Sequence, residues 1–178
     1  MRILTFLLVG LTIFLMAPSQ DITTVTSAIQ QLQPRVNDQR AQNLAKILVD
    51  AGTEVDIEPF LLASIVMRES SFQPALENRQ MFGQYNNLHE IGLMQNHGAS
   101  LRVRPDNCTS DLEGARCQIF TGARWLAFSR EYCGGSKWVW VSAYGRRACP
   151  TEREAREEGR VRRVRNLYVS IGGESWEE

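Results

Sequence analysis

The chain has 178 residues, 43% of them hydrophobic, which suits one domain with a hydrophobic core. Its 20 Lys and Arg side chains balance 20 Asp and Glu side chains, so the formal net charge is zero. A neutral chain lacks the global positive field that gathers nucleic acid, and no nucleic-acid partner is expected.

The first residues have the pattern of a secretory signal peptide. Arg2 provides a positive start, residues 3–16 form an uninterrupted apolar or small run, and residues 17–19 (Ala-Pro-Ser) resemble a cleavage site. The run is shorter than the roughly 20 residues that span a bilayer. We predict that residues 1–19 are a signal peptide and that the protein is exported to the periplasm or secreted. No stable membrane span would remain after cleavage; an uncleaved N-terminal anchor is the alternative.

Apolar residues at helical spacing predict two helices in the segment that follows. The first carries Ile22, Val25, Ile29 and Leu32 and is stopped by Pro34. The second runs from about residue 39 to 51, and we expect Gly52 to form its left-handed C-terminal cap. We expect residues 20–55 to be an N-terminal helical segment that packs on a domain of residues 56–172, with residues 173–178 as a tail.

The third predicted helix, from about residue 58 to 69, ends in a carboxylate on its apolar face. Leu62, Ile65, Val66 and Glu69 lie at i, i+3, i+4 and i+7. A carboxyl group in apolar surroundings loses hydration of its charged form and holds a proton more readily, as a general acid must. The alternatives are that Glu69 is exposed or that it pairs with an arginine such as Arg68 or Arg124.

Loops and further helices make up the second half of the chain. Residues 70–110 are rich in Gly, Asn, Gln and Pro, which predicts loops and a small hairpin. Helical spacing resumes over residues 119–127, 138–144 and 161–171. The last helix interleaves arginines, including Arg160, with glutamates, for which we expect a solvated face with local ion pairs rather than a polyanion site.

The cysteines all lie in this second half: Cys108, Cys117, Cys133 and Cys149. An even number behind an export signal favours disulfides. Three pairings are possible, and we prefer 108 with 117 and 133 with 149 because these close the shortest loops. Zinc is the competing interpretation. The sequence contains no Cys-x-x-Cys pair, and His89 and His97 do not form a His-Glu-x-x-His motif, so no metal site is predicted.

Ordered motifs in this chain resemble the soluble lytic transglycosylase family, which is similar to goose-type lysozyme. The motifs are Glu69-Ser70-Ser71-Phe72, Gly92-Leu93-Met94-Gln95 and Ala143-Tyr144, with a family-like helix over Ile119 to Leu126. The resemblance covers residues 57–171. It implies an α+β, predominantly α, lysozyme-like fold with a helical core and a small hairpin or loop lobe.

The resemblance also implies an activity and a set of site residues. Glu69 would act as acid and then base in cleaving the bond between N-acetylmuramic acid and N-acetylglucosamine, with a 1,6-anhydro product. Met94, Gln95 and Tyr144 would bind the substrate, although Met94 and Tyr144 also suit core packing. The partner is the peptidoglycan glycan strand, and no cofactor is needed, since proton transfer and positioning suffice.

The sequence departs from the family pattern at two places. The segment between Glu69 and Gly92 is longer than in the family, so Met81, Phe82 and Tyr85 would form either a lid or an ordinary packing cluster. Gly145 replaces the asparagine that follows the tyrosine in the family. A bridge between residues 133 and 149 would then hold Tyr144 in place instead.

Glu90 is a possible second catalytic carboxylate. Inverting glycosidases use a carboxylate pair to activate water, so Glu90 across the groove would favour a lysozyme-like hydrolysis; a solvated loop glutamate is the alternative.

The alternative to an enzyme is a non-catalytic peptidoglycan-binding component of a secretion or phage lysis apparatus. The sequence therefore predicts a site at Glu69 and leaves its chemical outcome open.

Overall fold

The structure is a computed structural model that describes residues 21–78, 83–85, 88–146 and 148–174. The described chain is predominantly helical, as predicted. Its elements are α1 (Ile22–Leu32), α2 (Asp38–Val55), α3 (Pro59–Ser70), α4 (Pro74–Glu77), β1 (Gly83–Tyr85), β2 (Leu88–Glu90), the 3-10 helix η1 (Ser100–Val103), α5 (Gly114–Cys133), α6 (Lys137–Gly145), α7 (Glu152–Glu157) and α8 (Gly159–Ser170). The two strands pair in antiparallel register, within the stretch where the sequence predicts a hairpin. The predicted signal peptide lies outside the described residues.

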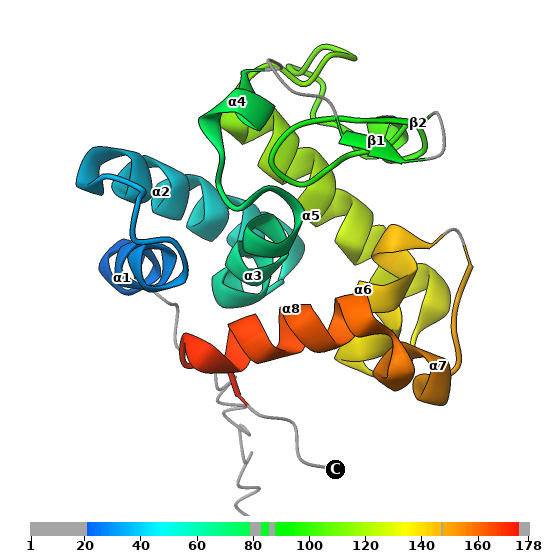
Figure 1. The fold of residues 1–178 in the computed structure, drawn as a ribbon. Helices are drawn as coiled ribbons and strands as arrows, with labels where there is room; N and C mark the ends of the chain where they lie inside the picture. Colours follow the sequence, from blue (N-terminus) through cyan, green and yellow to red (C-terminus); the bar gives the residue numbers. More distant parts are fainter. Residues whose placement is uncertain (1–20, 79–82, 86–87, 147, 175–178) are drawn as a thin grey trace, which may run out of the picture.

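Helix α3 lies in the middle of the fold, between α1 and α2 on one side and α8 on another (Figure 1). Pro59 begins it, where a missing N–H removes no helical hydrogen bond. Every residue of the segment 60–66 is buried, so α3 is a core element rather than a surface helix with one apolar stripe. The helix ends at Ser70, and Ser71 adopts the left-handed conformation with φ +52°. The central position of α3 carries Glu69 to the middle of the molecule.

Helix α2 is longer than predicted, and the prediction for Gly52 was wrong. The helix continues through Gly52 to Val55, and Asp56 takes the left-handed cap position with φ +53°. The glycine serves close packing instead, because a Cβ at position 52 would lie 2.4 Å from the carbonyl oxygen of Ile57. The chain can therefore turn tightly from α2 into α3.

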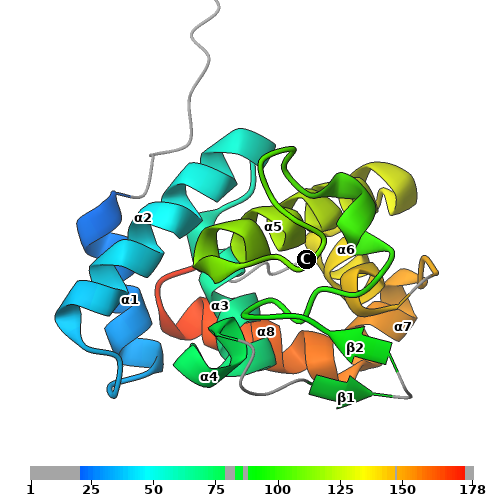
Figure 2. The same ribbon diagram turned by 90° about the horizontal axis from the view of Figure 1, so that it is seen from above.

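Helix α5 spans the molecule beside α2 and α6, as the view from above shows (Figure 2). Both of its ends carry a disulfide, and the pairing preferred from the sequence is confirmed: Cys108 is bonded to Cys117 and Cys133 to Cys149. Disulfides persist in oxidising compartments, which agrees with an exported protein. Among the helices of the described ranges, none is long and apolar enough to span a membrane.

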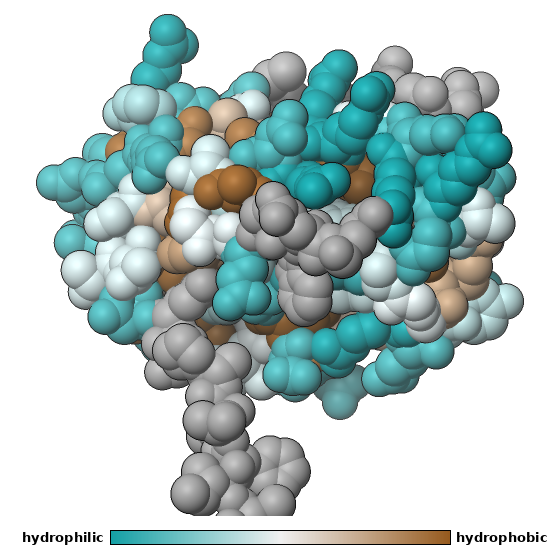
Figure 3. All heavy atoms as spheres, turned by 90° about the horizontal axis from the view of Figure 1, so that it is seen from below, coloured by the Kyte–Doolittle hydropathy of each residue, from teal (hydrophilic) through white to brown (hydrophobic). Residues whose placement is uncertain are grey.

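Helix α8 packs along α3 and is fastened by a polar cluster at its C-terminal half. The hydroxyl of Tyr168 donates a hydrogen bond to Glu58, whose carboxylate also pairs with Lys137 at 2.6 Å. This cluster ties the start of α3 and the start of α6 to α8. Hydrophilic residues cover much of the face on the α8 side (Figure 3), and Arg162, Arg163 and Arg165 are exposed as predicted. Arg160, on the same helix, is an exception.

Candidate functional site

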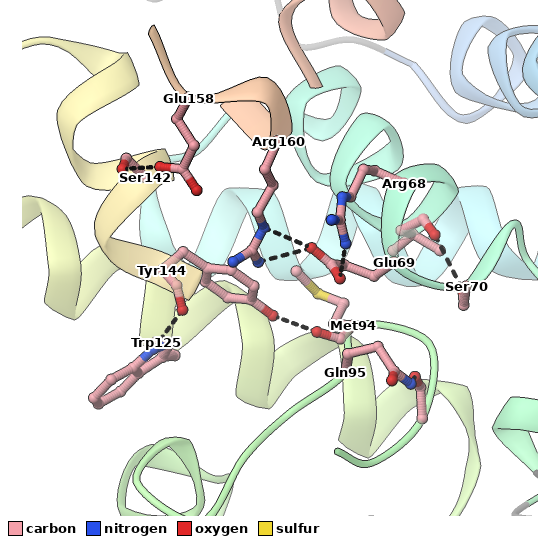
Figure 4. Close-up of polar contacts among 12 residues, drawn as sticks. Arg68, Glu69, Ser70, Met94, Gln95, Trp125, Ser142, Tyr144, Glu158 and Arg160 are labelled. Carbon is pink, nitrogen blue, oxygen red and sulfur yellow. Dashed lines mark hydrogen bonds and ion pairs between the residues drawn. The ribbon is translucent and has the colours of Figure 1, made fainter. Parts of the chain in front are cut away.

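The Glu69 carboxylate is held between two guanidinium groups (Figure 4). Its Oε1 accepts hydrogen bonds from Nε of Arg160 at 3.1 Å and from Nη2 of the same residue at 2.7 Å. Its Oε2 accepts from Nη1 of Arg68 at 2.8 Å. Only 6% of the Glu69 side chain is exposed. Glu69 therefore lies next to two positive charges as well as on the apolar helix face. The alternative interpretation of the sequence, an ion pair with Arg68, is confirmed.

The other arginine considered from the sequence is engaged elsewhere. Nε of Arg124 on α5 pairs with Glu54 on α2 at 2.6 Å. The partner of Glu69 that the sequence did not reveal is Arg160, 91 positions later in the chain. Arg160 belongs to a run of alternating arginines and glutamates. No feature of that sequence distinguishes Arg160 from the arginines that point into solvent. Its side chain is 19% exposed.

The end of α6 provides the space that the Arg160 guanidinium occupies. A Cβ at Gly145 would lie 0.9 Å from Nη1 of Arg160, so any other residue at 145 would collide with the guanidinium where it now lies. The ring of Tyr144 lies 5.5 Å from the guanidinium carbon, within the range of a cation–π contact. The departure from the family pattern at position 145 therefore has a structural counterpart: the glycine leaves room for an arginine.

Polar contacts at the start of α8 position the backbone of Arg160. Glu158 directly precedes α8, and its carboxylate accepts a hydrogen bond from the hydroxyl of Ser142 on α6. Nε of Arg146 pairs with the same carboxylate at 3.1 Å, and the Glu158 side chain is 13% exposed. Because both partners belong to the end of α6 or the residue after it, the first turn of α8 is fixed against the helix that carries Gly145.

A turn over residues 92–95 forms the next part of the site, and a buried glutamine supports it. Oε1 of Gln118 accepts the backbone N–H of Leu93 at 2.9 Å, while its Nε2 donates to the carbonyls of Glu77 and Leu112. Gly92 has φ +74°, and a Cβ there would lie 2.1 Å from Cδ of Gln118. Gln118 was not singled out in the sequence; its position next to Ile119, where the family-like helix begins, was the available signal.

Two of the proposed substrate-binding residues face the protein in this arrangement. The Met94 side chain is fully buried and packs against Gly122 of α5, where a Cβ would lie 2.5 Å from its sulfur. Nε2 of Gln95 donates to the carbonyl of Gly92 at 2.8 Å, which closes the turn. Met94 is thus a core residue here, which is the alternative noted for it, and the Gln95 amide supports its own loop.

Tyr144 connects the 92–95 turn to the Glu69 cluster, that is, Glu69 with Arg68 and Arg160. Tyr144 is buried, as its core-packing alternative predicts, and its hydroxyl donates to the carbonyl oxygen of Met94 at 2.7 Å. Burial raises the pKa of the Tyr144 hydroxyl well above its usual value, and the nearby charges of Glu69 and Glu90 raise it further. The phenol therefore stays protonated and serves as a hydrogen-bond donor.

Glu90, at the end of β2, belongs to the same electrostatic cluster. Burial raises the pKa of its carboxyl group, the charge of Glu69 raises it further, and Arg160 and Arg68 oppose this increase. The carboxyl groups of Glu69 and Glu90 therefore interact electrostatically with each other and with the guanidinium groups of Arg68 and Arg160. Glu90 is half-buried at the end of a strand, whereas the alternative was a solvated loop glutamate.

An apolar pocket of about 140 Å³ lies on another part of the surface, along the second half of α5. Trp125, Phe128 and Tyr132 line it, and their rings stack in succession with centroids 5.1 and 5.8 Å apart. Glu69 and Glu90 are not among its lining residues. The pocket therefore does not include the Glu69 and Glu90 carboxyl groups, although Trp125 of its lining donates a hydrogen bond to the carbonyl of Tyr144.

In the part of the chain that the structure describes, no group of three or more His, Cys, Asp or Glu residues is arranged to hold a metal ion. Met81 and Phe82, two of the three proposed lid residues, lie outside the described residues.

Comparison with known proteins yields no match: no family model, no curated protein and no solved structure matches this chain.

Proposed function

We propose that this protein is an exported enzyme with a lysozyme-like fold that cleaves peptidoglycan glycan strands, with Glu69 as its acid and base. The observation that carries the proposal is the convergence of three motifs that are far apart in the sequence. Glu69 ends α3, Tyr144 lies on α6, and the Tyr144 hydroxyl binds the Met94 carbonyl in the 92–95 turn at 2.7 Å. Their order and their clustering both support a glycan-cleaving site.

The proposed chemistry needs only proton transfer and positioning. Glu69 delivers a proton to the glycosidic oxygen between N-acetylmuramic acid and N-acetylglucosamine, and the bond from that oxygen to the anomeric carbon breaks. The substrate's own C6 hydroxyl then attacks the anomeric carbon and gives its proton to the Glu69 carboxylate. The product carries a 1,6-anhydro sugar, and Glu69 is protonated again.

Glu90 supports a second candidate, hydrolysis of the same bond by water. Its carboxyl group shares an electrostatic environment with Glu69, as the rise in its pKa caused by burial and by the Glu69 charge indicates. A second carboxylate near the acid is the arrangement with which inverting glycosidases activate water. The two candidates differ in one product: water yields a reducing end, whereas the C6 hydroxyl yields the anhydro end.

Digestion of purified sacculi by the protein without residues 1–19 tests both candidates. Mass spectrometry of the released muropeptides should show products 18 Da lighter than their hydrated forms if the anhydro end is formed. Glu69→Gln keeps the size of the side chain and removes the acid, so it should release nothing. Equal release by the Gln variant would exclude Glu69 as the acid, and binding to sacculi without any release would instead indicate a non-catalytic glycan-binding protein.

A further inference from the structure

The two oxygens of Glu69 have different partners, and these partners are anchored to different degrees. Arg160 binds Oε1 through two nitrogens, whereas Arg68 binds Oε2 through one. The Arg160 side chain is 19% exposed and the Arg68 side chain 31%. As long as both arginines stay in place, each oxygen of the carboxylate accepts hydrogen bonds and neither is available to hold a proton for a substrate.

The surroundings of Arg160 make it the fixed partner. Its guanidinium fills the space over Gly145, lies 5.5 Å from the Tyr144 ring, and starts from a helix turn that Glu158 fastens to α6. Arg68 has no comparable set of contacts: it lies in the last turn of α3, directly before Glu69, and among the described residues its ion pair is with the Glu69 carboxylate. The more exposed guanidinium is the one that can move into solvent.

We propose that Arg160 is a positioning residue that holds Oε1 of Glu69, that Gly145 provides the space it needs, and that Oε2 becomes the proton-donating oxygen when Arg68 moves away. This inference rests on the proposed glycan cleavage and specifies its geometry. Substrate entering the site displaces Arg68, Oε2 takes up a proton from solvent, and this proton then faces the glycosidic oxygen while Oε1 stays bound to Arg160. The groups that face Glu69 are Arg68 of α3, Glu90 of β2, Tyr144 of α6 and Arg160 of α8.

Substitutions on the two sides of the carboxylate should have opposite effects on turnover. Arg160→Met removes the fixed partner, and we expect kcat on sacculi to fall by roughly tenfold to a hundredfold, since a catalytic group displaced by about 1 Å loses up to about 100-fold in rate. Arg68→Met removes the competitor for Oε2 and should raise kcat at neutral pH. Arg162→Met, on the exposed face of α8, is the matched control and should leave kcat unchanged.

Gly145→Ala tests the same ion pair without removing any charge. The new Cβ would meet the end of a flexible arginine side chain, so the guanidinium shifts and the fold remains. This variant should reproduce the loss of kcat of Arg160→Met. Gly98→Ala is its control, because a Cβ at position 98 has nothing within 4 Å. Full activity of Gly145→Ala, or a fall in activity of Arg68→Met as large as that of Arg160→Met, would overturn the proposal.

A readout independent of turnover separates this inference from the proposed function. The Nε–H signals of the Arg68 and Arg160 side chains, followed by ¹⁵N NMR and assigned with Arg68→Met and Arg160→Met, report how firmly each guanidinium is held. The Arg160 signal should exchange with solvent more slowly than the Arg68 signal, because Nε of Arg160 donates to Oε1 of Glu69 at 3.1 Å, and Gly145→Ala should make it faster. Equally fast exchange of the two signals in the unsubstituted protein would refute the role of Arg160, even if no glycan is cleaved. Slow exchange of the Arg160 signal with no release from sacculi would refute glycan cleavage alone.

Discussion

The hydroxyl of Tyr144 donates a 2.7 Å hydrogen bond to the carbonyl oxygen of Met94, 50 positions earlier in the chain. Both residues are buried, so water does not reach the carbonyl easily if the phenol is lost. The bond fastens the 92–95 turn to α6, next to the Glu69 cluster. It therefore couples the stability of the fold to the geometry of the candidate site.

Tyr144→Phe should lower the free energy of unfolding by about 1–2 kcal/mol, because a buried carbonyl oxygen is left without its donor. Urea unfolding with an unchanged m-value measures the effect. Tyr132→Phe is the matched control, since that side chain is 72% exposed and should change stability little. Equal stabilities of the two variants would mean that the Tyr144 hydrogen bond contributes nothing to stability.

Removing the bridge between Cys133 and Cys149 should lower both the melting temperature and the activity. The bridge spans 16 positions and joins the end of α5 to the segment between α6 and α7, close to the helix that carries Tyr144. A loop of this size corresponds to a stabilisation of about 3 kcal/mol in the chain-entropy model. Calorimetry and sacculus digestion of Cys133→Ser/Cys149→Ser measure the two effects.

The other bridge provides the comparison for that experiment. Cys108–Cys117 spans 9 positions and lies at the opposite end of α5. Its removal should lower the melting temperature by less, because a shorter loop loses less entropy on closure, and should affect activity less. If removal of the Cys133–Cys149 bridge leaves both quantities unchanged, the bridge does not help to hold Tyr144.

Glu90→Gln should stabilise the protein at neutral and higher pH but not in acid. Burial and the charge of Glu69 raise the pKa of the Glu90 carboxyl group above its usual 4.5. A carboxyl group with a raised pKa contributes its stability at low pH, and this contribution is lost as pH rises through the raised value. The Gln side chain does not ionise. Glu90→Gln should therefore be more stable than the unsubstituted protein above the raised pKa, and this difference in stability should vanish below about pH 4.5.

Chemical denaturation at a series of pH values tests this expectation. Glu131→Gln is the control, because Glu131 is exposed on α5. The difference between Glu90→Gln and the unsubstituted protein should grow with pH, whereas the difference for the control should stay flat. An advantage of Glu90→Gln that increases toward acid pH would have the wrong sign and would contradict the environment described for Glu90.

Gly92→Ala should destabilise the protein by about 2 kcal/mol or more. The backbone at Gly92 has φ +74°, and the new Cβ would lie 2.1 Å from Cδ of Gln118, whose amide is engaged by three hydrogen bonds. Gly114→Ala separates the two causes, since Gly114 has φ +76° but a Cβ there has nothing within 4 Å. Thermal unfolding should show a larger loss for Gly92→Ala, and equal losses would leave backbone strain as the whole explanation.

The local features of this protein follow from its sequence because they depend on residues close together in the chain. Apolar spacing predicted α1, α2, α3, α5, α6 and α8, and short loop lengths favoured the disulfide pairing that is observed. Glu69 was singled out because a carboxylate among Leu62, Ile65 and Val66 is unusual on an apolar helix face. The end of α2 was missed, because the reason for Gly52 is a contact with Ile57 that arises only when α3 packs against it.

Only the tertiary structure decided which charges surround Glu69. Arg160 looks like its neighbours in an alternating charged helix, and it becomes the partner of Glu69 because α8 packs on α3 and its first turn is fastened to α6. Periodicity distinguishes a buried from an exposed face, but it does not reveal an ion pair between residues 91 positions apart. The sequence by itself predicted the main helices, favoured the cysteine pairing that is observed and singled out Glu69; long-range packing determined the arginine that binds the Glu69 carboxylate and the glycine that makes room for it.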